Sequence, residues 1–378
     1  MALSKLCYIA NMRFPTERAH GIQVASMCSA FAKQGVAVTL LVPNRKTSIE
    51  DPFLYYGVPR NFTIEKVPVP DIVRFGKTGF FVESFTFAWR ATRRAKKEPN
   101  AAVYTREEWP LFFLSRDVAF YEAHQLRRSF VFSWLIKRAK GIVSITQGLK
   151  NALVEAGLSE QRILVAHDGY DEEQFTERVS RAEARERLGL PQDRKIAMYV
   201  GGLEKWKGSQ TLLAASEELR KCGIEVAMIG GTEKELRGLR KRYPEVNFIG
   251  ARPYRELSVN QQAADVLIVP SSKETKLGSL FTSPLKLFAH MASGVPLVVA
   301  DVPALREVVG GAEAFMFSPD SPQSLAETIK KALSSERLPE GRAKAAEAEK
   351  RVREFTWDKR AKKLLAYMQG CLNEKKSA

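Results

Sequence analysis

Cysteine is scarce in this chain, and its four cysteines lie far apart without a C-x-x-C pair. They are Cys7, Cys28, Cys222 and Cys371. Such spacing fits neither a disulfide framework nor a zinc site, and it favours buried thiols in a reducing compartment. We therefore predict a cytoplasmic location and no metal site.

Long apolar runs are also missing. No stretch approaches the roughly 20 apolar residues that a membrane-spanning helix needs, and even residues 131–136 are bracketed by basic residues. The apolar run at the N-terminus is too short for the core of a signal peptide, and Asn11 and Arg13 follow it at once. We expect this run to form the first β-strand and any membrane contact to be peripheral.

Acidic residues are outnumbered, with 43 Asp and Glu against 59 Lys and Arg and a formal net charge of +16. A surface of this sign attracts polyanions or anionic lipid headgroups. No helix-turn-helix, RNP or zinc-finger pattern accompanies the charge, so nucleic acid is not a predicted partner. A peripheral position on the inner face of a membrane stays open.

Short apolar runs alternate with amphipathic stretches along most of the chain, which is typical of βα units on a mostly parallel sheet. Because 378 residues are too many for one hydrophobic core, we predict an α/β fold of two domains. The first series of strands is predicted at Leu6–Ala10, Ala37–Val42, Thr63–Val67, Ala102–Thr105, Val118–Glu122, Gly141–Ile145 and Ile163–Val165. The second series is predicted at Ile196–Val200, Glu225–Ile229, Val246–Ile249, Val266–Val269 and Leu297–Ala300.

The segment 168–186 is strongly charged and carries no strand signal, so we place the domain boundary there. The predicted domains are residues 1–175 and residues 176–357. Residues 341–363 are rich in Ala, Glu, Lys and Arg, a composition that favours helix. We expect a C-terminal helix at about 358–378 to pack back on the first domain.

A glycine-rich turn follows the first strand of the second series. In parallel sheets, ligands bind beyond the carboxyl ends of the strands, where helix N-termini offer backbone N–H groups to anions. Gly201 and Gly202 leave room for a phosphate to approach the backbone, and Lys207 at the next helix entrance supplies a cation. The turn therefore predicts a diphosphate cradle, with an ordinary turn and a solvated lysine as the alternative.

Two further strand ends carry weaker candidates. Gly230, Gly231 and Thr232 follow the next strand but lack the G-x-G-x-x-G spacing. A later helix is predicted to open with Ser283 as its N-cap and Lys286 in its first turn, where a bound anion would offset the lysine's unfavourable position in the helix dipole. Ordinary turns and plain surface placement are the alternatives.

Histidine is rare, and one histidine stands directly after a predicted strand. His124 follows the strand Val118–Glu122, and three of the four histidines fall near strand-end loops. The four are His20, His124, His167 and His290. Such an imidazole can donate a hydrogen bond at neutral pH and hold developing charge, although a single histidine is more often structural.

Five segments, taken in order, resemble the retaining glycosyltransferases with the GT-B fold, of the family-four kind. Residues 11–24 resemble the glycine-containing donor-side loop of that family, residues 121–124 its E-x-H segment, and residues 166–171 its P-N-G-V-D hinge. Residues 199–208 resemble its Y-V-G-R-L-x-x-x-K-G motif, and residues 282–296 resemble its S-P-L-K-L-F-E-Y-M-A-x-G-x-P variant. The resemblance covers nearly the whole chain.

The resemblance implies two Rossmann-like domains with parallel sheets facing across a cleft and a C-terminal helix crossing between them. The N-terminal domain would lie on the acceptor side, and the C-terminal domain would bind a nucleotide sugar. The implied reaction transfers a hexosyl or related sugar with retention of configuration, without a metal ion or other cofactor. A glycan or lipid-linked acceptor in polysaccharide biosynthesis would complete it.

The resemblance also implies roles for individual residues. His124 would be the catalytic residue near the transferred sugar, and Gly21 would let its loop approach the donor. The residues implied to bind the donor diphosphate are Gly21, Gly201, Gly202, Lys207, Ser283 and Lys286. Those implied to contact the nucleotide or sugar are Gly230, Gly231, Thr232, Glu274 and His290.

The chain departs from the family pattern at three positions. Gly202 replaces the usual arginine, and Phe281 and Ala289 replace a Glu-x7-Glu pair. Loss of the second carboxylate removes a contact to the ribose hydroxyls and weakens donor binding unless Glu274 or His290 substitutes. A catalytically weak or inactive nucleotide-sugar or carbohydrate-binding protein is therefore an alternative, and a GT-B sugar-nucleotide epimerase is another.

Residues 79–97 mix aromatic side chains with a basic end. A helix of this composition can lie in the surface of an anionic bilayer, with Arg93, Arg94, Lys96 and Lys97 facing the membrane. The alternative is a domain helix that buries its aromatic face and leaves a solvated tip.

Overall fold

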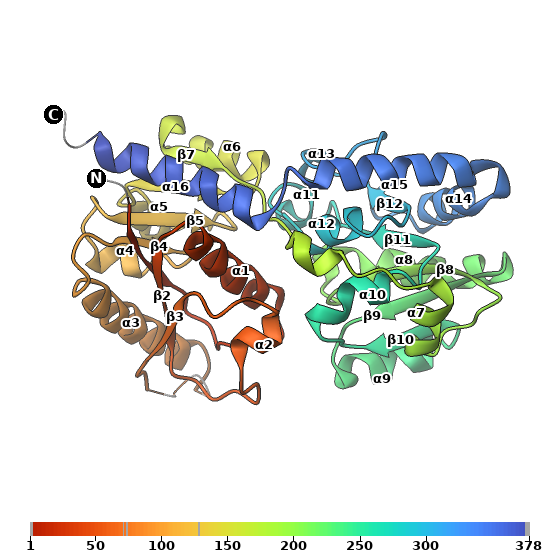
Figure 1. Cartoon of the computed structure of the whole chain (residues 1–378), viewed down its shortest axis with the longest axis horizontal. Helices are drawn as coiled ribbons and strands as arrows, with labels where there is room; N and C mark the ends of the chain where they lie inside the picture. The colour runs from red at the N-terminus through yellow and green to blue at the C-terminus, as the bar shows by residue number, and fades with distance from the viewer. Residues whose placement is uncertain (1–2, 71, 73–74, 128, 375–378) are drawn as a thin grey trace. The chain divides into compact units, whose positions relative to one another are not determined.

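The computed structural model describes residues 3–70, 72, 75–127 and 129–374, which form two compact units (Figure 1). Unit 1 holds the residues up to Asp168 together with those from Trp357 onward, and unit 2 spans Gly169–Thr356. The chain therefore leaves unit 1 at the start of the charged segment and returns to it ahead of the last helix.

Unit 1 is built on a seven-stranded parallel sheet in the order β3-β2-β1-β4-β5-β6-β7. Its strands are β1 Lys5–Ile9, β2 Ala37–Pro43, β3 Thr63–Val67, β4 Ala102–Thr105, β5 Ala119–Ala123, β6 Gly141–Ser144 and β7 Ile163–Val165. The inner strands are apolar along their length because helices cover both faces of the sheet. The seven predicted strands are confirmed.

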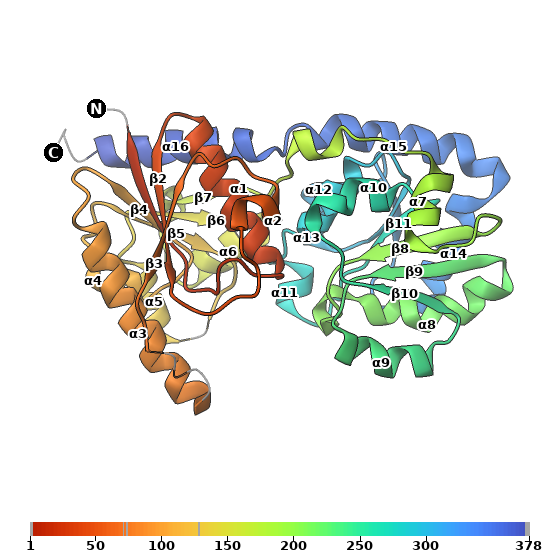
Figure 2. The same cartoon turned by 60° about the horizontal axis from the view of Figure 1, so that its bottom comes forward.

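The helices of unit 1 lie on both faces of this sheet (Figures 1 and 2). They are α1 Ala19–Lys33, α2 Pro52–Tyr56, α3 Gly76–Ala95, α4 Pro110–Phe113, α5 Phe130–Ile136, α6 Gln147–Glu155 and α16 Trp357–Asn373. The last of them, α16, packs against α1. The Tyr367 hydroxyl of α16 donates to the Arg162 carbonyl at 2.6 Å and accepts from the Ile142 N–H at 3.1 Å. These bonds fasten the C-terminal helix to the sheet of unit 1.

Unit 2 contains a six-stranded parallel sheet in the order β10-β9-β8-β11-β12-β13. Its strands are β8 Lys195–Val200, β9 Ile224–Ile229, β10 Val246–Gly250, β11 Val266–Val269, β12 Leu297–Ala300 and β13 Phe315–Phe317. The five predicted strands are confirmed. The edge strand β13 was not predicted.

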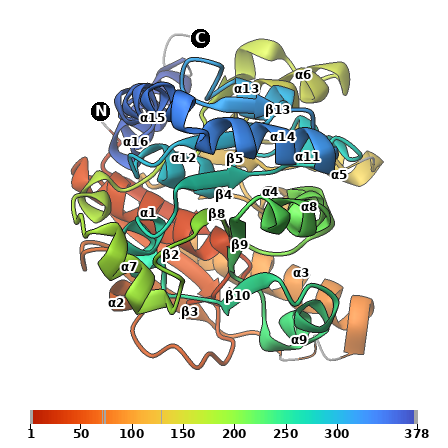
Figure 3. The same cartoon turned by 90° about the vertical axis from the view of Figure 1, so that its right-hand side faces the viewer.

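Helices flank the sheet of unit 2, with α8 beside α14, while α7 contacts α10, α10 contacts α12 and α12 contacts α15 (Figure 3). The helices are α7 Arg181–Leu188, α8 Ser209–Lys221, α9 Glu233–Arg242, α10 Leu257–Gln261, α11 Lys276–Ser279, α12 Leu285–Met291, α13 Pro303–Arg306, α14 Pro322–Leu333 and α15 Leu338–Val352. Residues 341–363 are mostly helical, as predicted, but they do not form one helix, because the chain breaks between α15 and α16. At the break, the Tyr170 N–H bonds the Phe355 carbonyl at 3.1 Å.

Two expectations about the surface can be compared with the described residues. Cys7 and Cys28 are buried, but Cys222 is exposed and Cys371 is half-buried, so the prediction of buried thiols holds for two of the four. Within the described ranges, no helix is long and apolar enough to cross a membrane.

Candidate functional site

Each sheet has one point at which the strand order reverses. In unit 1 this point lies between β1 and β4, and in unit 2 it lies between β8 and β11. Loops diverge to opposite sides of the sheet there, which opens a crevice beyond the carboxyl ends of the strands. Both units place polar and charged side chains at this point.

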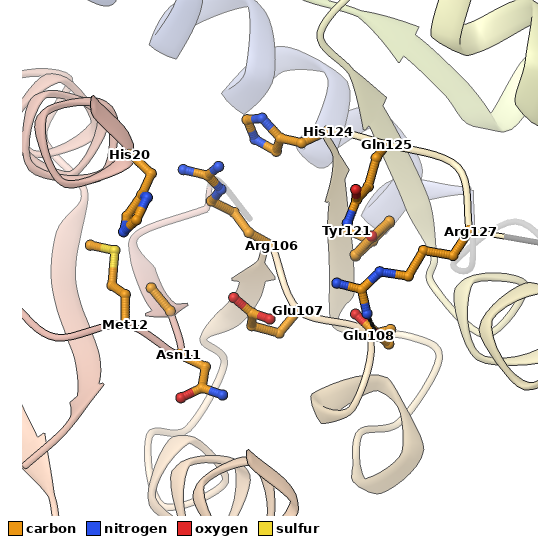
Figure 4. Close-up of a pocket in the computed structure, with 11 residues that line it drawn as sticks. Asn11, Met12, His20, Arg106, Glu107, Glu108, Tyr121, His124, Gln125 and Arg127 are labelled. Atoms are coloured by element: carbon orange, nitrogen blue, oxygen red, sulfur yellow. Dashed lines mark hydrogen bonds and ion pairs between the residues drawn. The ribbon is translucent and has the colours of Figure 1, made fainter. Parts of the chain in front are cut away.

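The crevice of unit 1 is a pocket of about 200 Å³ at the carboxyl ends of β1, β4 and β5 (Figure 4). Its walls combine carboxylates, guanidinium groups and imidazoles. The lining residues are Ala10, Asn11, Met12, His20, Arg106, Glu107, Glu108, Tyr121, His124, Gln125 and Arg127. His124, the predicted catalytic residue, thus lies in a polar pocket together with a second histidine.

His124 is a neutral imidazole at pH 7. Burial and the nearby Arg106 lower the pKa of His124 to about 4, although Glu122 acts in the opposite direction. Its Nε2 lies 2.6 Å from the Glu122 Oε1, and an ionised carboxylate only accepts hydrogen bonds. Nε2 therefore carries the hydrogen, and Nδ1 is left as an acceptor. This corrects the expectation that His124 donates to developing charge.

Glu122 is the buried anchor beneath His124. It is 0% exposed and accepts hydrogen bonds from Gln23 at 2.6 Å, from Arg360 at 3.0 Å and from the Tyr104 hydroxyl. Burial alone would raise the pKa of Glu122, but Arg360 and then His124 hold it well below its usual range. The carboxylate therefore stays ionised and fixes the orientation of the imidazole.

Glu107 is a pocket carboxyl that the sequence analysis did not single out. Burial and the neighbouring Glu108 raise the pKa of Glu107 to about 7, against the opposing effect of Arg106. At neutral pH its carboxyl can therefore both donate and accept hydrogen bonds. Glu108 is occupied differently, because it pairs with Arg127. The available signal was position: these residues follow β4 directly, at the edge where His124 follows β5.

Gly21 has a structural explanation within unit 1. A Cβ at Gly21 would collide with the Tyr56 hydroxyl and would lie 2.7 Å from the Thr16 Cγ2. Tyr56 uses that hydroxyl to accept from the Thr16 N–H and to donate to the Thr16 carbonyl, at 2.7 and 2.9 Å. The glycine therefore makes room for a tyrosine that fixes the loop after β1. A donor contact at Gly21 stays a prediction.

In unit 2, the space beside the glycines after β8 is filled by an ion pair. A Cβ at Gly202 would lie 2.7 Å from the Lys207 Nζ and would collide with the Glu204 carboxylate. Lys207 and Glu204 pair with each other at 2.8 Å. The region where the family carries an arginine is thus occupied by a lysine whose charge is balanced by a partly exposed carboxylate.

Lys286 lies beside the same glycines, and its Nζ has no hydrogen-bond partner among the described residues. Its Nζ is buried and sits 4.3 Å from the centre of the Tyr199 ring, and its Cδ would lie 3.7 Å from a Cβ at Gly201. Burial and then repulsion from Lys207 lower the pKa of Lys286 well below its usual range. An ammonium in this position lacks an anionic partner.

Three other residues of unit 2 were predicted to contact the donor: Ser283, Thr232 and His290. Helix α12 begins at Leu285 with Pro284 as its cap residue, so the prediction that Ser283 is the N-cap is wrong. Thr232 caps α9 through a reciprocal bond with Glu235. His290 is 0% exposed, so the described surface does not present it to a ligand.

The remaining glycines and Glu274 lie at the strand ends. Gly230 has φ +126° and would collide with the Gly201 carbonyl if it carried a Cβ, while a Cβ at Gly231 would lie 2.8 Å from Leu203. Both glycines are needed for packing of the loops after β8 and β9. Glu274 is exposed in the loop after β11, and this loop bonds the β8 loop through the Ser272 N–H and the Trp206 carbonyl at 3.0 Å.

Clusters of metal-ligating side chains were sought in the described part of the chain. No group of three or more His, Cys, Asp or Glu side chains there is arranged to hold a metal ion. The charged groups beside the glycines after β8 are Lys207, Lys286 and Glu204, and the two lysines suit an anion.

Comparisons with known families and structures agree with this architecture. Residues 180–352 match the family described as glycosyl transferases group 1, and residues 21–174 match glycosyltransferase family 4. D-inositol 3-phosphate glycosyltransferase of Corynebacterium aurimucosum is 28% identical over 238 residues, 57% of this chain and 53% of that protein. The chain spans about half the length of the curated relatives it matches.

Two solved structures share the fold over nearly their full length. Sucrose-phosphate synthase from Thermosynechococcus elongatus has a TM-score of 0.76 at 18% identity and covers 98% of each chain. HepE from Anabaena, solved with UDP and glucose, has a TM-score of 0.76 at 17% identity and covers 97% of this chain and 100% of that one. With both units matched and the two family models together spanning most of its length, the chain belongs to the GT-B glycosyltransferases of the family-four, group 1 kind.

Proposed function

We propose that this protein transfers a hexosyl or related sugar from a nucleoside diphosphate sugar to an acceptor, with retention of configuration. The observation that carries the proposal is the pair of lysines, Lys207 and Lys286, beside two consecutive glycines at the switch point of unit 2. Lys207 pairs with a surface carboxylate, and the buried Lys286 Nζ has no hydrogen-bond partner among the described residues. The Anabaena relative of this fold was solved with UDP and glucose, which supports a nucleotide sugar as the donor.

In this proposal the lysines hold the leaving diphosphate. The diphosphate displaces Glu204 from Lys207 and gives Lys286 the anionic partner that it lacks, and the N-terminus of the 13-residue helix α8 adds its dipole. The carbon–oxygen bond between sugar and diphosphate breaks, and these cations stabilise the charge that develops on the diphosphate. Lys286 thereby supplies the cation that is missing at Gly202, and no metal ion is required.

The pocket of unit 1 would hold the transferred sugar and the acceptor. His124 Nδ1 accepts a hydrogen bond from a hydroxyl of the sugar, because Glu122 holds the ring hydrogen on Nε2 and burial beside Arg106 keeps the imidazole neutral. Glu107 bonds the acceptor hydroxyl, whose proton passes to the leaving phosphate oxygen as the new glycosidic bond forms on the same face. The acceptor would be a glycan or a lipid-linked glycan of the cell envelope, and the net charge of +16 supports a cytoplasmic enzyme held at the inner face of the membrane.

Thermal-shift screening of nucleotide sugars, followed by product analysis, tests the proposal. We expect one donor to raise the melting temperature and to be converted to its nucleoside diphosphate when an acceptor is added. Lys207→Met and Lys286→Met should each abolish the shift, and Lys205→Met, on an exposed neighbour, is the matched control. Donor isomerised without acceptor would instead indicate an epimerase.

A non-catalytic nucleotide-sugar or carbohydrate-binding protein is the second candidate. It is favoured by Gly202, Phe281 and Ala289, which remove charged groups that other family members use. Saturable donor binding that never leads to turnover, with a broad set of glycan acceptors, would establish it.

A further inference from the structure

Unit 1 exposes large apolar side chains on one set of neighbouring helices. We use the name aromatic face for the surface formed by α3, α4 and α5 and marked by Phe81, Phe85, Trp89, Phe112, Phe130 and Trp134. These side chains are between 37% and 86% exposed. Of the exposed large apolar residues in the described ranges, only Leu54 lies away from this region. Apolar surface gathered in this way marks a contact site more often than chance exposure does.

The aromatic face is continuous from α3 to α5. The ring centres of Phe85 and Phe112 are 6.4 Å apart, and those of Phe112 and Trp134 are 6.0 Å apart. Within α3, Phe81 and Phe85 stack with centres 6.4 Å apart. The three helices lie next to one another in Figure 2 and contact each other in sequence.

The core of unit 1 does not need these rings. Helix α3 already buries Phe87, Ala88 and Ala91. Phe81, Phe85 and Trp89 recur every fourth residue and therefore share one side of the helix, and all three are exposed. The interpretation of residues 79–97 as a helix with a buried aromatic face is thus wrong for all of its aromatic residues except Phe87.

The charge around the aromatic face has one sign. The only acidic residue within α3, α4 and α5 is Glu83, which is 0% exposed and pairs with Arg45. Cations surround the rings, with Arg93 over Trp89 at 5.1 Å and Arg138 over Trp134 at 5.4 Å. The three helices therefore present aromatic rings and positive charge without an exposed carboxylate.

We propose that the aromatic face docks on an anionic lipid bilayer, with its exposed rings in the headgroup and acyl boundary and its cations on the lipid phosphates. Aromatic side chains favour that boundary, and basic residues are attracted to anionic headgroups. A second copy of this chain is a poorer occupant, because a symmetric contact would bring the same cations together without carboxylates to pair with them.

This docking surface differs from the basic end predicted from the sequence. Arg94 is held by Glu65 and Glu98, each at 2.9 Å, so its charge is balanced within the protein. Arg93 remains part of the docking surface because it lies over Trp89. For its biological use the inference rests on the proposed transfer to a membrane-held acceptor, but the binding itself can be measured without a donor.

Flotation of the full chain with vesicles of equimolar phosphatidylglycerol and phosphatidylcholine tests the inference. The double variant Phe81→Ser/Phe130→Ser removes the two most exposed rings of the aromatic face, and we expect at least about a tenfold loss of vesicle binding. Leu54→Ser, at a residue that is 64% exposed on α2, is the matched control and should bind like the wild type. Arg93→Gln/Arg138→Gln should weaken binding, whereas Lys234→Gln/Lys241→Gln on α9 should not.

Donor binding, measured on the same variants by thermal shift, separates the two proposals. Lost vesicle binding with unchanged donor binding supports the docking surface. If the wild-type protein binds donor but not these vesicles, the docking proposal is overturned and the proposed function is not. If it binds the vesicles but no donor, only the proposed function is overturned. A dimer that the Phe81→Ser/Phe130→Ser variant dissociates, without vesicle binding by the wild type, overturns docking in favour of self-association.

Discussion

Arg360 should be one of the most sensitive positions in unit 1, although it lies on the C-terminal helix. Its side chain is 3% exposed and its Nη2 lies 3.0 Å from the Glu122 carboxylate, which is 0% exposed. Arg360→Met removes one partner of this buried pair and leaves an uncompensated carboxylate. Removing one partner of a buried ion pair destabilises a protein by about 3–5 kcal/mol, so we expect a loss of this size in the free energy of unfolding of unit 1.

The sign of the pH dependence follows from Glu122. In the wild type, its pKa is held below the usual range, so its contribution to stability is present above the unfolded pKa and is lost as the pH falls through the folded pKa. Without Arg360, burial raises the pKa instead. The destabilisation by Arg360→Met should therefore be largest at and above neutral pH and should shrink in acid, where Glu122 can protonate.

Urea unfolding from pH 5 to pH 8, with hydrogen exchange of β4 and β5 peptides as the readout local to unit 1, measures this effect. Lys362→Met, at an exposed position of the same helix, is the control and should change stability by less than about 0.5 kcal/mol. Adding Glu122→Gln to Arg360→Met should recover part of the loss. A loss of unfolding free energy below about 1 kcal/mol would refute the reasoning, because typical exposed ion pairs contribute no more than that. Additive effects of Arg360→Met and Glu122→Gln would refute it as well.

Four further outcomes are expected. Gly21→Ala should destabilise unit 1 because its Cβ meets Tyr56 and Thr16. Gly238→Ala on α9, where a Cβ has nothing within 4 Å, should raise the free energy of unfolding in urea by about 0.5–1 kcal/mol. A Gly21→Ala protein that is more stable than the Gly238→Ala protein would contradict the close contact of Gly21 with Tyr56. Lys286→Met should raise the melting temperature, because it removes a buried amine that makes no hydrogen bond to the described residues, while weakening donor binding. His124 should titrate in NMR near pH 4, and the protein should lose stability as the pH falls from about 6.5 toward that value, because the unfolded chain takes up the proton first; a midpoint near the ordinary value would be inconsistent with burial of the imidazole beside Arg106. Transfer rates should show an inflection near pH 7 that Glu107→Gln removes, and an unchanged profile would exclude Glu107 as its source.

The fold could largely be read from the sequence because strands in parallel sheets are continuous apolar runs. All twelve predicted strands exist in the structure. The edge strand β13 was missed, and the helix expected over residues 341–363 is broken between α15 and α16, where the Phe355 carbonyl accepts a hydrogen bond from Tyr170, a residue far away in the chain.

The candidate site was predictable at single positions but not as a set. Lys207 and His124 were found because they follow strands. The residues that pair with His124 and Lys207 were not predicted. Glu122, beneath His124, is bonded to Arg360, which lies 238 positions away in the sequence. Glu204, the partner of Lys207, occupies the space in which a side chain at Gly202 would lie. Lys286 was predicted for its place in a helix, whereas its burial over Tyr199 depends on packing between α12 and β8.

Calorimetric titration of the full chain with UDP and with GDP tests the central claim, that Lys207 and Lys286 together bind a nucleoside diphosphate. One of the two nucleotides should bind, and Lys207→Met and Lys286→Met should each weaken it by about tenfold or more, since a hydrogen bond to a charged group contributes about 1.5–3 kcal/mol. Lys205→Met should leave the affinity unchanged. Binding of either nucleotide with equal affinity in all three variants, or no binding by the wild type, would contradict the account.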